Sequence, residues 1–298
     1  MRRGAASARL LHDGAVDDLD RLADLLDRRN VIVLSGAGIS TDSGIPDYRG
    51  PSGAALRKHA PMTFQAFTRD PAARHRYWAR SHVGWPLMRG ALPNVSHHAV
   101  AALEASGAVS GVITQNVDGL HSAAGSRDVI DLHGRLDRVV CLDCGGITAR
   151  DEVAGRLDEA NPGWRSRPGL VNPDGDVDVS DDDVARFVMV DCEACGGPLK
   201  PDVVYFGENV PKDRVDESYR RVDECAALLV LGSSLQVYSG RRFVTRAAER
   251  GIPVAIVNQG PTKGDDLADV RVDAPLADVL IEAAGMPAGE TEAIPAHP

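Results

Sequence analysis

Uninterrupted runs of apolar residues that end in glycine or in a polar residue recur along the chain. The first run covers residues 31–34 and leads into Ser35, Gly36 and Gly38. Apolar runs of this length are typical of strands that are buried on both faces of a parallel sheet. The pattern predicts strands over residues 31–35, 111–114, 129–132, 228–231 and 254–257.

A helical repeat precedes the first predicted strand. Apolar residues stand at positions 16, 19, 22, 25 and 26, the spacing of an amphipathic helix, which predicts a helix to about Arg29. Residues 51–95 carry scattered aromatic residues and prolines instead. That pattern is typical of short helices joined by loops, and it predicts an insertion that forms a lid or a pocket wall.

Composition narrows the class of protein. The 298 residues are 43% hydrophobic and 26% charged, which suits one sizeable core with an appended module. The formal net charge of −10 disfavours a nucleic-acid protein with a basic surface. No apolar run approaches the roughly 20 residues of a membrane span. The first fifteen residues lack the apolar core of a secretory signal, so we expect a cytoplasmic protein, with the mitochondrial matrix as the alternative.

The glycines after the first strand suit a nucleotide-binding turn. Gly36 and Gly38 let the backbone approach a ligand and present N–H groups to a phosphate. The usual dinucleotide fingerprint has Gly or Ala where Thr41 stands, and an acidic residue about 20 positions further on, where this chain has Ala55-Leu56-Arg57. A hydride-transferring Rossmann domain is therefore disfavoured, although nucleotide binding is not. Residues 41–50 predict an irregular loop over the ligand.

A second polar cluster follows the strand at 111–114. The side chains of Gln115, Asn116 and Asp118 offer donors and acceptors that suit a carboxamide such as nicotinamide. The strand at 129–132 leads to His133, whose imidazole can titrate near neutrality as a general base must. A single histidine in such a place is more often structural, so these residues alone leave both roles open.

Four cysteines form two Cys-x-x-Cys pairs, each followed by glycine. This zinc-ribbon pattern predicts a tetrahedral zinc site with no open position for water, so the metal is expected to be structural. Two redox disulfides or free core cysteines are the alternatives. A fifth cysteine, Cys225, lies beside an apolar run and is expected to be a packed core thiol, and this cysteine usage implies a reducing compartment. The pairs are Cys141 with Cys144 and Cys192 with Cys195.

Between the cysteine pairs, residues 174–183 are strongly acidic. They lack the spacing of an EF-hand calcium loop to its closing glutamate, so they predict a solvated surface loop. After the second pair, Lys200–Glu208 is expected to be an extended segment with which the chain returns to the sheet. Ser233, Ser234 and Asn258 stand at later strand ends, where they suit ribose hydroxyls and phosphate.

The run GAGISTDSGIPDYRG at residues 36–50 resembles the signature loop of the sirtuins, the NAD-dependent protein-lysine deacylases. Tyr48 stands where that family usually has Phe. TQNVDGLH, KPDVVYFGE, GSSLQVYSG and VNQGPT are also similar to sirtuin motifs, so the resemblance covers about residues 22–280. RYWARSHVGWP, CLDCG and PDGDV look most like class II sirtuins.

The resemblance implies an α/β fold, in which a Rossmann-like parallel sheet domain carries an inserted zinc-ribbon and helical module. The NAD-binding domain is expected at 1–50, 92–137 and 200–285, the helical insertion at 51–91, the zinc ribbon at 138–199 and a flexible tail at 286–298.

Site residues carry over position by position from the family motifs. The NAD loop falls on Gly36, Ala37, Gly38, Ile39, Thr41, Asp47, Tyr48 and Arg49. The nicotinamide and ribose contacts fall on Gln115, Asn116, Val117 and Asp118, and the adenosine side on Gly232, Ser233, Ser234, Asn258, Gln259 and Gly260. His133 is the base and Asn116 a second catalytic residue. Val204, Phe206 and Gly207 match the segment that pairs with the substrate peptide as an added strand.

The implied reaction transfers an acyl group from lysine to ADP-ribose. The acyl oxygen attacks the anomeric carbon of the co-substrate NAD as nicotinamide leaves, and His133 then deprotonates the ribose hydroxyls so that the 2′-oxygen attacks. The products are lysine, nicotinamide and O-acyl-ADP-ribose. A protein mono-ADP-ribosyltransferase and an NAD-binding regulatory protein without turnover are the alternatives.

The motifs do not fix which acyl group is removed. Tyr77 and Arg80 have the spacing of a succinyl-selective pair in class III sirtuins but stand about one position out of register, so a neutral acyl group is expected. The partners are acylated lysine side chains of proteins. We expect a monomer that binds neither nucleic acid nor membrane, with one structural Zn2+ per chain.

Overall fold

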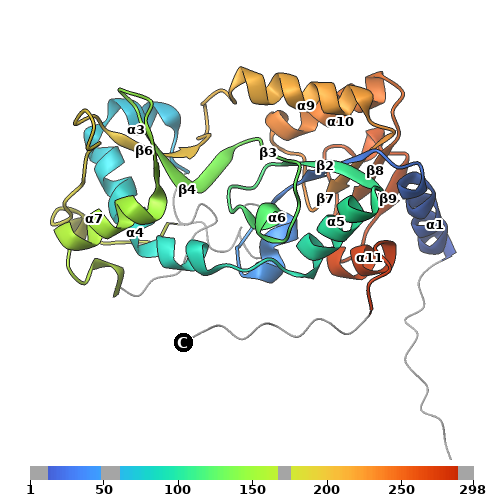
Figure 1. Cartoon of the computed structure of the whole chain (residues 1–298), viewed down its shortest axis with the longest axis horizontal. Helices are drawn as coiled ribbons and strands as arrows, with labels where there is room; N and C mark the ends of the chain where they lie inside the picture. Colours follow the sequence, from blue (N-terminus) through green and yellow to red (C-terminus); the bar gives the residue numbers. More distant parts are fainter. Residues whose placement is uncertain (1–12, 48–60, 167–175, 288–298) are drawn as a thin grey trace, which may run out of the picture.

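Six parallel strands form the main sheet of the computed structural model, which describes residues 13–47, 61–166 and 176–287 (Figure 1). The strand order is β3-β2-β1-β7-β8-β9. Counted along the chain within this sheet, that is the order 3-2-1-4-5-6 of a doubly wound dinucleotide-binding sheet. The strands are β1 (Val31–Ser35), β2 (Val109–Thr114), β3 (Val129–Asp131), β7 (Ala227–Leu231), β8 (Val254–Val257) and β9 (Val270–Val272).

The order of strands reverses at β1, which pairs with β2 on one side and with β7 on the other. Ligands of open α/β sheets bind outside the carboxyl ends of the strands at this point of reversal. The segments that follow β1, β2 and β7 begin at Gly36, Gln115 and Gly232. The topology therefore brings three of the predicted polar segments to one edge.

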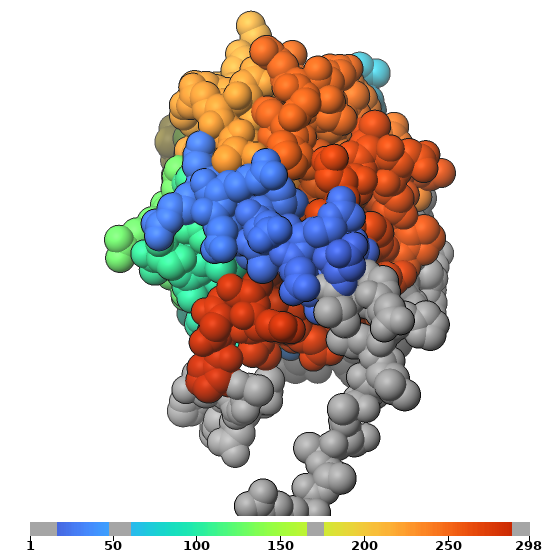
Figure 2. Space-filling view, turned by 90° about the vertical axis from the view of Figure 1, so that its right-hand side faces the viewer, coloured from blue at the N-terminus to red at the C-terminus, as the bar shows by residue number. Residues whose placement is uncertain are grey.

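Helices cover both faces of the main sheet because successive side chains of a strand point to opposite sides. Val33 of β1 packs with α1 (Asp13–Asp27), α5 (Val95–Ser106) and α11 (Leu276–Ala283), whereas Leu34 packs with α9 (Lys212–Glu224) and α10 (Tyr238–Glu249). At the end of the molecule that carries α1, the N-terminal residues drawn in blue lie between the red C-terminal residues and the orange ones (Figure 2). Among the described residues no helix is long and apolar enough to cross a membrane.

A smaller unit lies at the opposite end of the molecule from α1 (Figure 1). Its antiparallel sheet has the order β5-β4-β6, and it packs with helices around a second core that includes Phe67, Trp78 and Trp164. The strands are β4 (Gly134–Cys141), β5 (Ile147–Ala149) and β6 (Leu199–Val203); the helices are α3 (Phe64–Arg69), α4 (Pro71–Gly90), α7 (Arg150–Ala160) and α8 (Asp181–Val184).

A separate apolar cluster joins the two units. Ile45 and Leu120 come from the main unit, whereas Trp85, Met88 and Val203 come from the smaller one, and all five are buried. The residues that follow β1 therefore rest against α4 and β6.

The predicted fold class is confirmed, but the smaller unit departs from the prediction in three places. Residues 71–90 form one long helix in place of several short ones, because Asp70 caps it by accepting from the Ala72 N–H and Pro71 suits the first turn. Lys200 lies in β6, which pairs with β4 and not with the main sheet, so the chain leaves the small sheet only after Val203. Strand β4 begins at Gly134, inside the range predicted for the NAD-binding domain.

The loop predictions also need correction. Thr41 to Ser43 continue a 3-10 helix that starts at Ala37, and an irregular path begins only at Gly44, whose φ is +81°. The acidic segment is not simply solvated. Asp176 is buried, and its Oδ2 lies 3.1 Å from Nε of Arg80, whose Nη2 lies 2.7 Å from Asp178 Oδ1. Arg80 therefore ties this segment to α4.

Candidate functional site

The turns after β1 and β7 lie in direct contact. The Gly36 N–H donates to the Leu231 carbonyl at 3.0 Å and the Gly38 N–H to the Gly232 carbonyl at 2.9 Å. A Cβ at Gly36 would lie 2.7 Å from Cβ of Ser233, and one at Gly38 would lie 2.8 Å from the Gly232 carbonyl oxygen. Only glycine fits this approach, which places Ala37 and Ile39 of the predicted NAD loop beside Gly232 and Ser233.

The hydroxyl of Ser40 joins the segments that follow β1 and β2. Its Oγ donates to Asp118 Oδ2 at 2.8 Å and accepts from Asn116 Nδ2 at 3.0 Å. Asn116 Nδ2 lies also 3.2 Å from the Gly36 carbonyl oxygen. Burial raises the pKa of Asp118, and the hydrogen bonds from the Leu120 N–H and Ser40 offset that shift only in part. Asn116 and Asp118 are thus held beside the predicted NAD loop by contacts within the protein.

Two buried histidines contact the serines that adjoin Asn116 and Asp118. His121 Nε2 lies 2.8 Å from Ser35 Oγ, His97 Nε2 lies 3.4 Å from Ser40 Oγ, and the two rings are 5.0 Å apart. Burial lowers the pKa of His97 to about 3 and that of His121 to about 4. Both rings are therefore neutral at neutral pH. His97 lies in the first turn of α5, which Asn94 caps.

His133 makes one hydrogen bond with each ring nitrogen. Nδ1 lies 2.9 Å from the Gln115 carbonyl oxygen, and Nε2 lies 2.8 Å from Ser239 Oγ. Because a carbonyl oxygen only accepts, Nδ1 carries the proton and Nε2 has the free electron pair. Burial lowers the pKa of His133, the Gln115 hydrogen bond raises it, and the charges of Arg242 and Arg214 lower it. The ring is thus neutral, with Nε2 able to accept a proton.

Gln115 connects this histidine to the glycine turns. Its Nε2 donates to Ser233 Oγ at 2.9 Å and to the Ser35 carbonyl at 3.2 Å, while its own carbonyl oxygen accepts from His133. Val117, two residues further, bonds through its carbonyl oxygen to the Leu136 N–H. The residues predicted from three separate motifs therefore share one hydrogen-bonded cluster.

The loop after β8 is closed by its own contacts. Asn258 Nδ2 donates to the carbonyl oxygens of Gln259 at 2.8 Å and Gly260 at 3.0 Å, and Arg271 donates to the Asn258 carbonyl at 3.0 Å. The Ser234 carbonyl accepts from the Lys263 N–H at 3.0 Å. These residues follow the neighbouring strands β7 and β8, and the bond between Ser234 and Lys263 joins the two loops.

The segment predicted to bind peptide starts beside His133. The Val204 N–H donates to the His133 carbonyl at 2.8 Å, and a Cβ on Gly134 would overlap the Asp202 carbonyl oxygen. The Phe206 carbonyl accepts from the Phe64 N–H at 3.0 Å, and Phe206 itself is 41% exposed. Gly207 has a φ of +77°. This segment leaves the small sheet next to the histidine.

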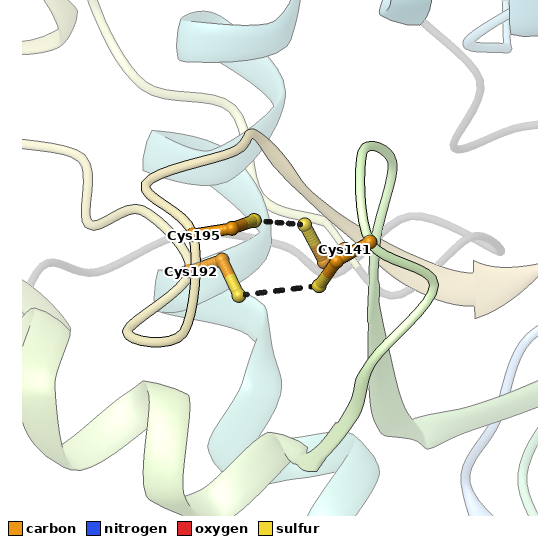
Figure 3. A group of neighbouring side chains, drawn as sticks. Cys141, Cys192 and Cys195 are labelled. Carbon is orange, nitrogen blue, oxygen red and sulfur yellow. Dashed lines mark hydrogen bonds between the residues drawn. The ribbon is translucent and has the colours of Figure 1, made fainter.

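The four paired cysteines face one another from two turns (Figure 3). Cys141 Sγ lies 3.5 Å from Cys195 Sγ, Cys144 Sγ lies 3.8 Å from Cys192 Sγ, and all four sulfurs lie within 4.8 Å of one another. A tetrahedral zinc site with bonds of about 2.3 Å places its sulfurs about 3.8 Å apart. The four cysteines are therefore positioned to bind one zinc ion, and no other such group of His, Cys, Asp or Glu occurs in the part of the chain described.

Some residues of the site were absent from the prediction. Ser40, His121 and Ser239 lie within the motifs that resemble the sirtuins, but no sequence pattern predicts a role for them. A buried hydroxyl beside a predicted base has no pattern of its own in sequence. Asp47 is the last described residue of the predicted NAD loop, and Tyr48 and Arg49 lie outside the described residues.

A family model described as "Sir2 family" matches residues 36–239. The chain is 57% identical over 263 residues to NAD-dependent protein deacetylase 1 of Streptomyces coelicolor, which covers 88% of each chain. It is 55% identical over 281 residues to NAD-dependent protein deacetylase 1 of Mycobacterium avium, covering 93% of this chain and 96% of the relative.

Solved structures of Sir2 proteins also resemble this chain. A structure described as "Sir2-p53 peptide-NAD+" superposes with a TM-score of 0.71 at 31% identity and covers 90% of this chain and 98% of its own. Another, described as "Structural Basis for the Mechanism and Regulation of Sir2 Enzymes", has a TM-score of 0.71 at 32% identity and covers 90% and 97%.

Proposed function

This chain belongs to the Sir2 family, and we propose that the cluster around Gly36, Asn116 and His133 is its active site. The protein is an NAD-dependent protein deacetylase, the name that relatives at 50–57% identity share, and NAD is its co-substrate. These names support deacetylation and not the ADP-ribosyltransferase alternative. The family inferred from the motifs is confirmed.

The residues at the strand ends fit NAD. Gly38 and Gly232 contact each other so closely that neither position has room for a side chain. This contact lies next to the amide of Asn116 and the carboxylate of Asp118. We assign the binding of the nicotinamide carboxamide to Asn116 and Asp118. We assign the binding of the adenosine half of NAD to Ser233, Ser234 and the loop of residues 258–260. When bound, NAD supplies an electrophilic ribose carbon from which nicotinamide leaves.

His133 is the general base of this proposal. The observation that carries it is the pair of hydrogen bonds that fixes the Nδ1–H tautomer and leaves Nε2 as the acceptor. The lowered pKa keeps the ring neutral at neutral pH, the state in which it can remove a proton. Asn116, one residue from the carbonyl that holds His133, links the base to the predicted nicotinamide contacts.

The acylated lysine reaches the site through the segment after β6. Protein substrates follow from the deacetylase names, and a related Sir2 structure is described with a p53 peptide. We propose that Val204, Phe206 and Gly207 pair with the peptide backbone, with the exposed Phe206 ring as an apolar contact. The hydrogen bond from Val204 to His133 brings this segment next to the base.

The direct test replaces the base. His133→Ala is expected to lower NAD-dependent deacetylation of an acetyl-lysine peptide by about 10²–10⁴-fold, the usual value of a general base. Nicotinamide exchange, which precedes the base step, should be affected less, and zinc content and melting temperature should stay near wild type. His98→Gln, an exposed histidine on α5, is the matched control. Wild-type deacetylation by His133→Ala would show that another group is the base.

We propose that the preferred acyl group is neutral. Arg80, the candidate partner of an acidic acyl group, is paired with Asp176 and Asp178. The guanidinium of Arg150, whose charge interacts with Tyr77, is buried with Cζ 4.8 Å and 5.2 Å from the ring centroids of Trp78 and Trp85. A panel of acyl peptides tests this, and faster removal of succinyl or glutaryl than of acetyl would contradict it.

We further propose a cytoplasmic monomer that binds no nucleic acid. None of the five cysteines forms a disulfide, which supports a reducing compartment, and the net charge of −10 opposes binding to phosphate backbones. Cell fractionation, light scattering and a DNA-binding titration test the three parts separately.

A further inference from the structure

The first turn of α10 lies directly on the proposed base. The helix starts at Tyr238 after Val237, which makes no side-chain capping bond, and Ser239 follows in the first turn. Ser239 Oγ lies 2.8 Å from His133 Nε2, the only ring nitrogen that is not committed to a carbonyl. The electron pair that must accept a proton therefore faces the hydroxyl of Ser239.

The neighbouring glycine shows that this contact depends on close packing. A Cβ on Gly240 would overlap the side-chain amide of Gln115, the residue whose carbonyl holds the other nitrogen of His133. The absence of a side chain at 240 lets α10 approach closely enough for the short serine side chain to reach the ring. Ser239 and Gly240 thus contact the two halves of one Gln115–His133 unit.

A hydroxyl can serve both protonation states of the ring. It donates to Nε2 of the neutral imidazole, and after a rotation of its O–H it accepts from Nε2–H of the imidazolium. The bond to the charged ring is the stronger one. A hydroxyl in this place therefore favours proton uptake, whereas burial and the charges of Arg242 from α10 and Arg214 from α9 oppose it.

We propose that Ser239 is a positioning residue for His133: its hydroxyl orients Nε2 in the resting protein and accepts the Nε2–H bond after the base has taken a proton. The proton moves to Nε2 from a hydroxyl of the ribose that remains after nicotinamide has left, and the Ser239 proton stays on its own oxygen. No proton passes through the serine. This inference rests on the proposed function, because it takes His133 to be the base.

The first measurement uses the NAD-free protein. Nitrogen-15 NMR of the imidazole nitrogens, with His133→Gln to assign the signals, gives the tautomer and the pKa of His133. In Ser239→Ala the imidazolium loses a charge-assisted hydrogen bond, whereas the neutral ring loses only a neutral one. The difference corresponds to about one pKa unit, so the pKa of His133 is expected to fall by about that amount. Ser239→Thr keeps the hydroxyl and should restore it. Ser110→Ala, which removes an exposed hydroxyl from β2, should change nothing.

The second measurement is kinetic. Ser239→Ala should reduce kcat for deacetylation roughly three- to tenfold at neutral pH, move the acid limb of the pH profile to lower pH, and leave nicotinamide exchange unchanged. Ser239→Thr should recover both. An unchanged His133 pKa in Ser239→Ala, or no recovery with threonine, overturns the proposal. Absence of deacetylation in the wild type would instead contradict the proposed function, and the NMR result would still decide the Ser239 contact.

Discussion

Lys200 is a buried charge next to the segment that we propose binds peptide, and Lys200→Met removes that charge at similar length. The Lys200 side chain is 5% exposed, and its Nζ lies 3.1 Å from Glu208 Oε2 and 2.5 Å from the Val203 carbonyl oxygen. The ammonium also lies 4.8 Å from the centroid of the Tyr205 ring. One side chain thus holds both ends of the stretch from Val203 to Glu208.

The size of the effect follows from what the substitution leaves behind. Removing one partner of a buried ion pair typically costs about 3–5 kcal/mol, because the other charge stays buried without compensation. The Glu208 side chain keeps 20% exposure and still accepts from the Tyr205 N–H at 2.9 Å. We therefore expect a loss near the lower end, about 3 kcal/mol of unfolding free energy.

Urea denaturation of wild type and variant measures this loss. Arg220→Met is the matched control, because Arg220 also pairs with carboxylates but its side chain is 54% exposed, and such pairs contribute about 0–1 kcal/mol. In steady-state assays Lys200→Met should raise KM for the acetyl peptide more than KM for NAD, since the tethered segment is the one that carries Phe206. A loss no larger than that of Arg220→Met would refute the reasoning.

Three further predictions concern the glycine turn, the metal and the buried histidines. Gly38→Ala should destabilise by roughly 1–3 kcal/mol because its Cβ meets backbone at 2.8 Å, whereas Gly155→Ala, in open space within α7, should stabilise by about 0.5–1 kcal/mol in the same denaturation assay. Cys192→Ala should lower zinc content by elemental analysis together with melting temperature, because zinc binding and folding are coupled, and full zinc at unchanged stability would contradict the site. The pKa of His121 is lowered to about 4, so below about pH 6.5 the unfolded chain binds a proton that the folded chain does not. The unfolding free energy should therefore fall as pH drops from about 6.5 toward 4, by about 2 kcal/mol at pH 5. A His121→Gln variant whose unfolding free energy falls just as steeply between pH 7 and 5 would contradict this.

The strands of the main sheet were predictable because burial on both faces leaves an uninterrupted apolar run. Five of the six strands followed from that rule. The sixth, β9, did not, because Arg271 stands between Val270 and Val272 and interrupts the apolar run. The arginine points to the loop after β8, where it bonds to the Asn258 carbonyl, so a contact made in space breaks the pattern along the chain.

The acidic segment is a second case in which a contact made in space could not be predicted from the sequence. Counted along the sequence, residues 174–183 contain mainly like charges, and such runs are usually solvated. The cation that pairs with Asp176 and Asp178 is Arg80, nearly a hundred positions earlier on α4. Only the packing of α4 against this segment reveals the pair, and the same pairing removes Arg80 from the candidates for binding an acidic acyl group.

The proposed active site was predictable as a set of strand ends, but the protonation state of its base was not. The tautomer of His133 is fixed by the backbone carbonyl of Gln115, an atom that every residue type would supply at that position. Its other nitrogen is held by Ser239, one of the commonest residue types in a helix start. Because neither partner has a side-chain pattern specific to this role, the sequence could place a histidine at the right strand end. The arrangement of β2, β3 and α10 is what makes its Nε2 the acceptor.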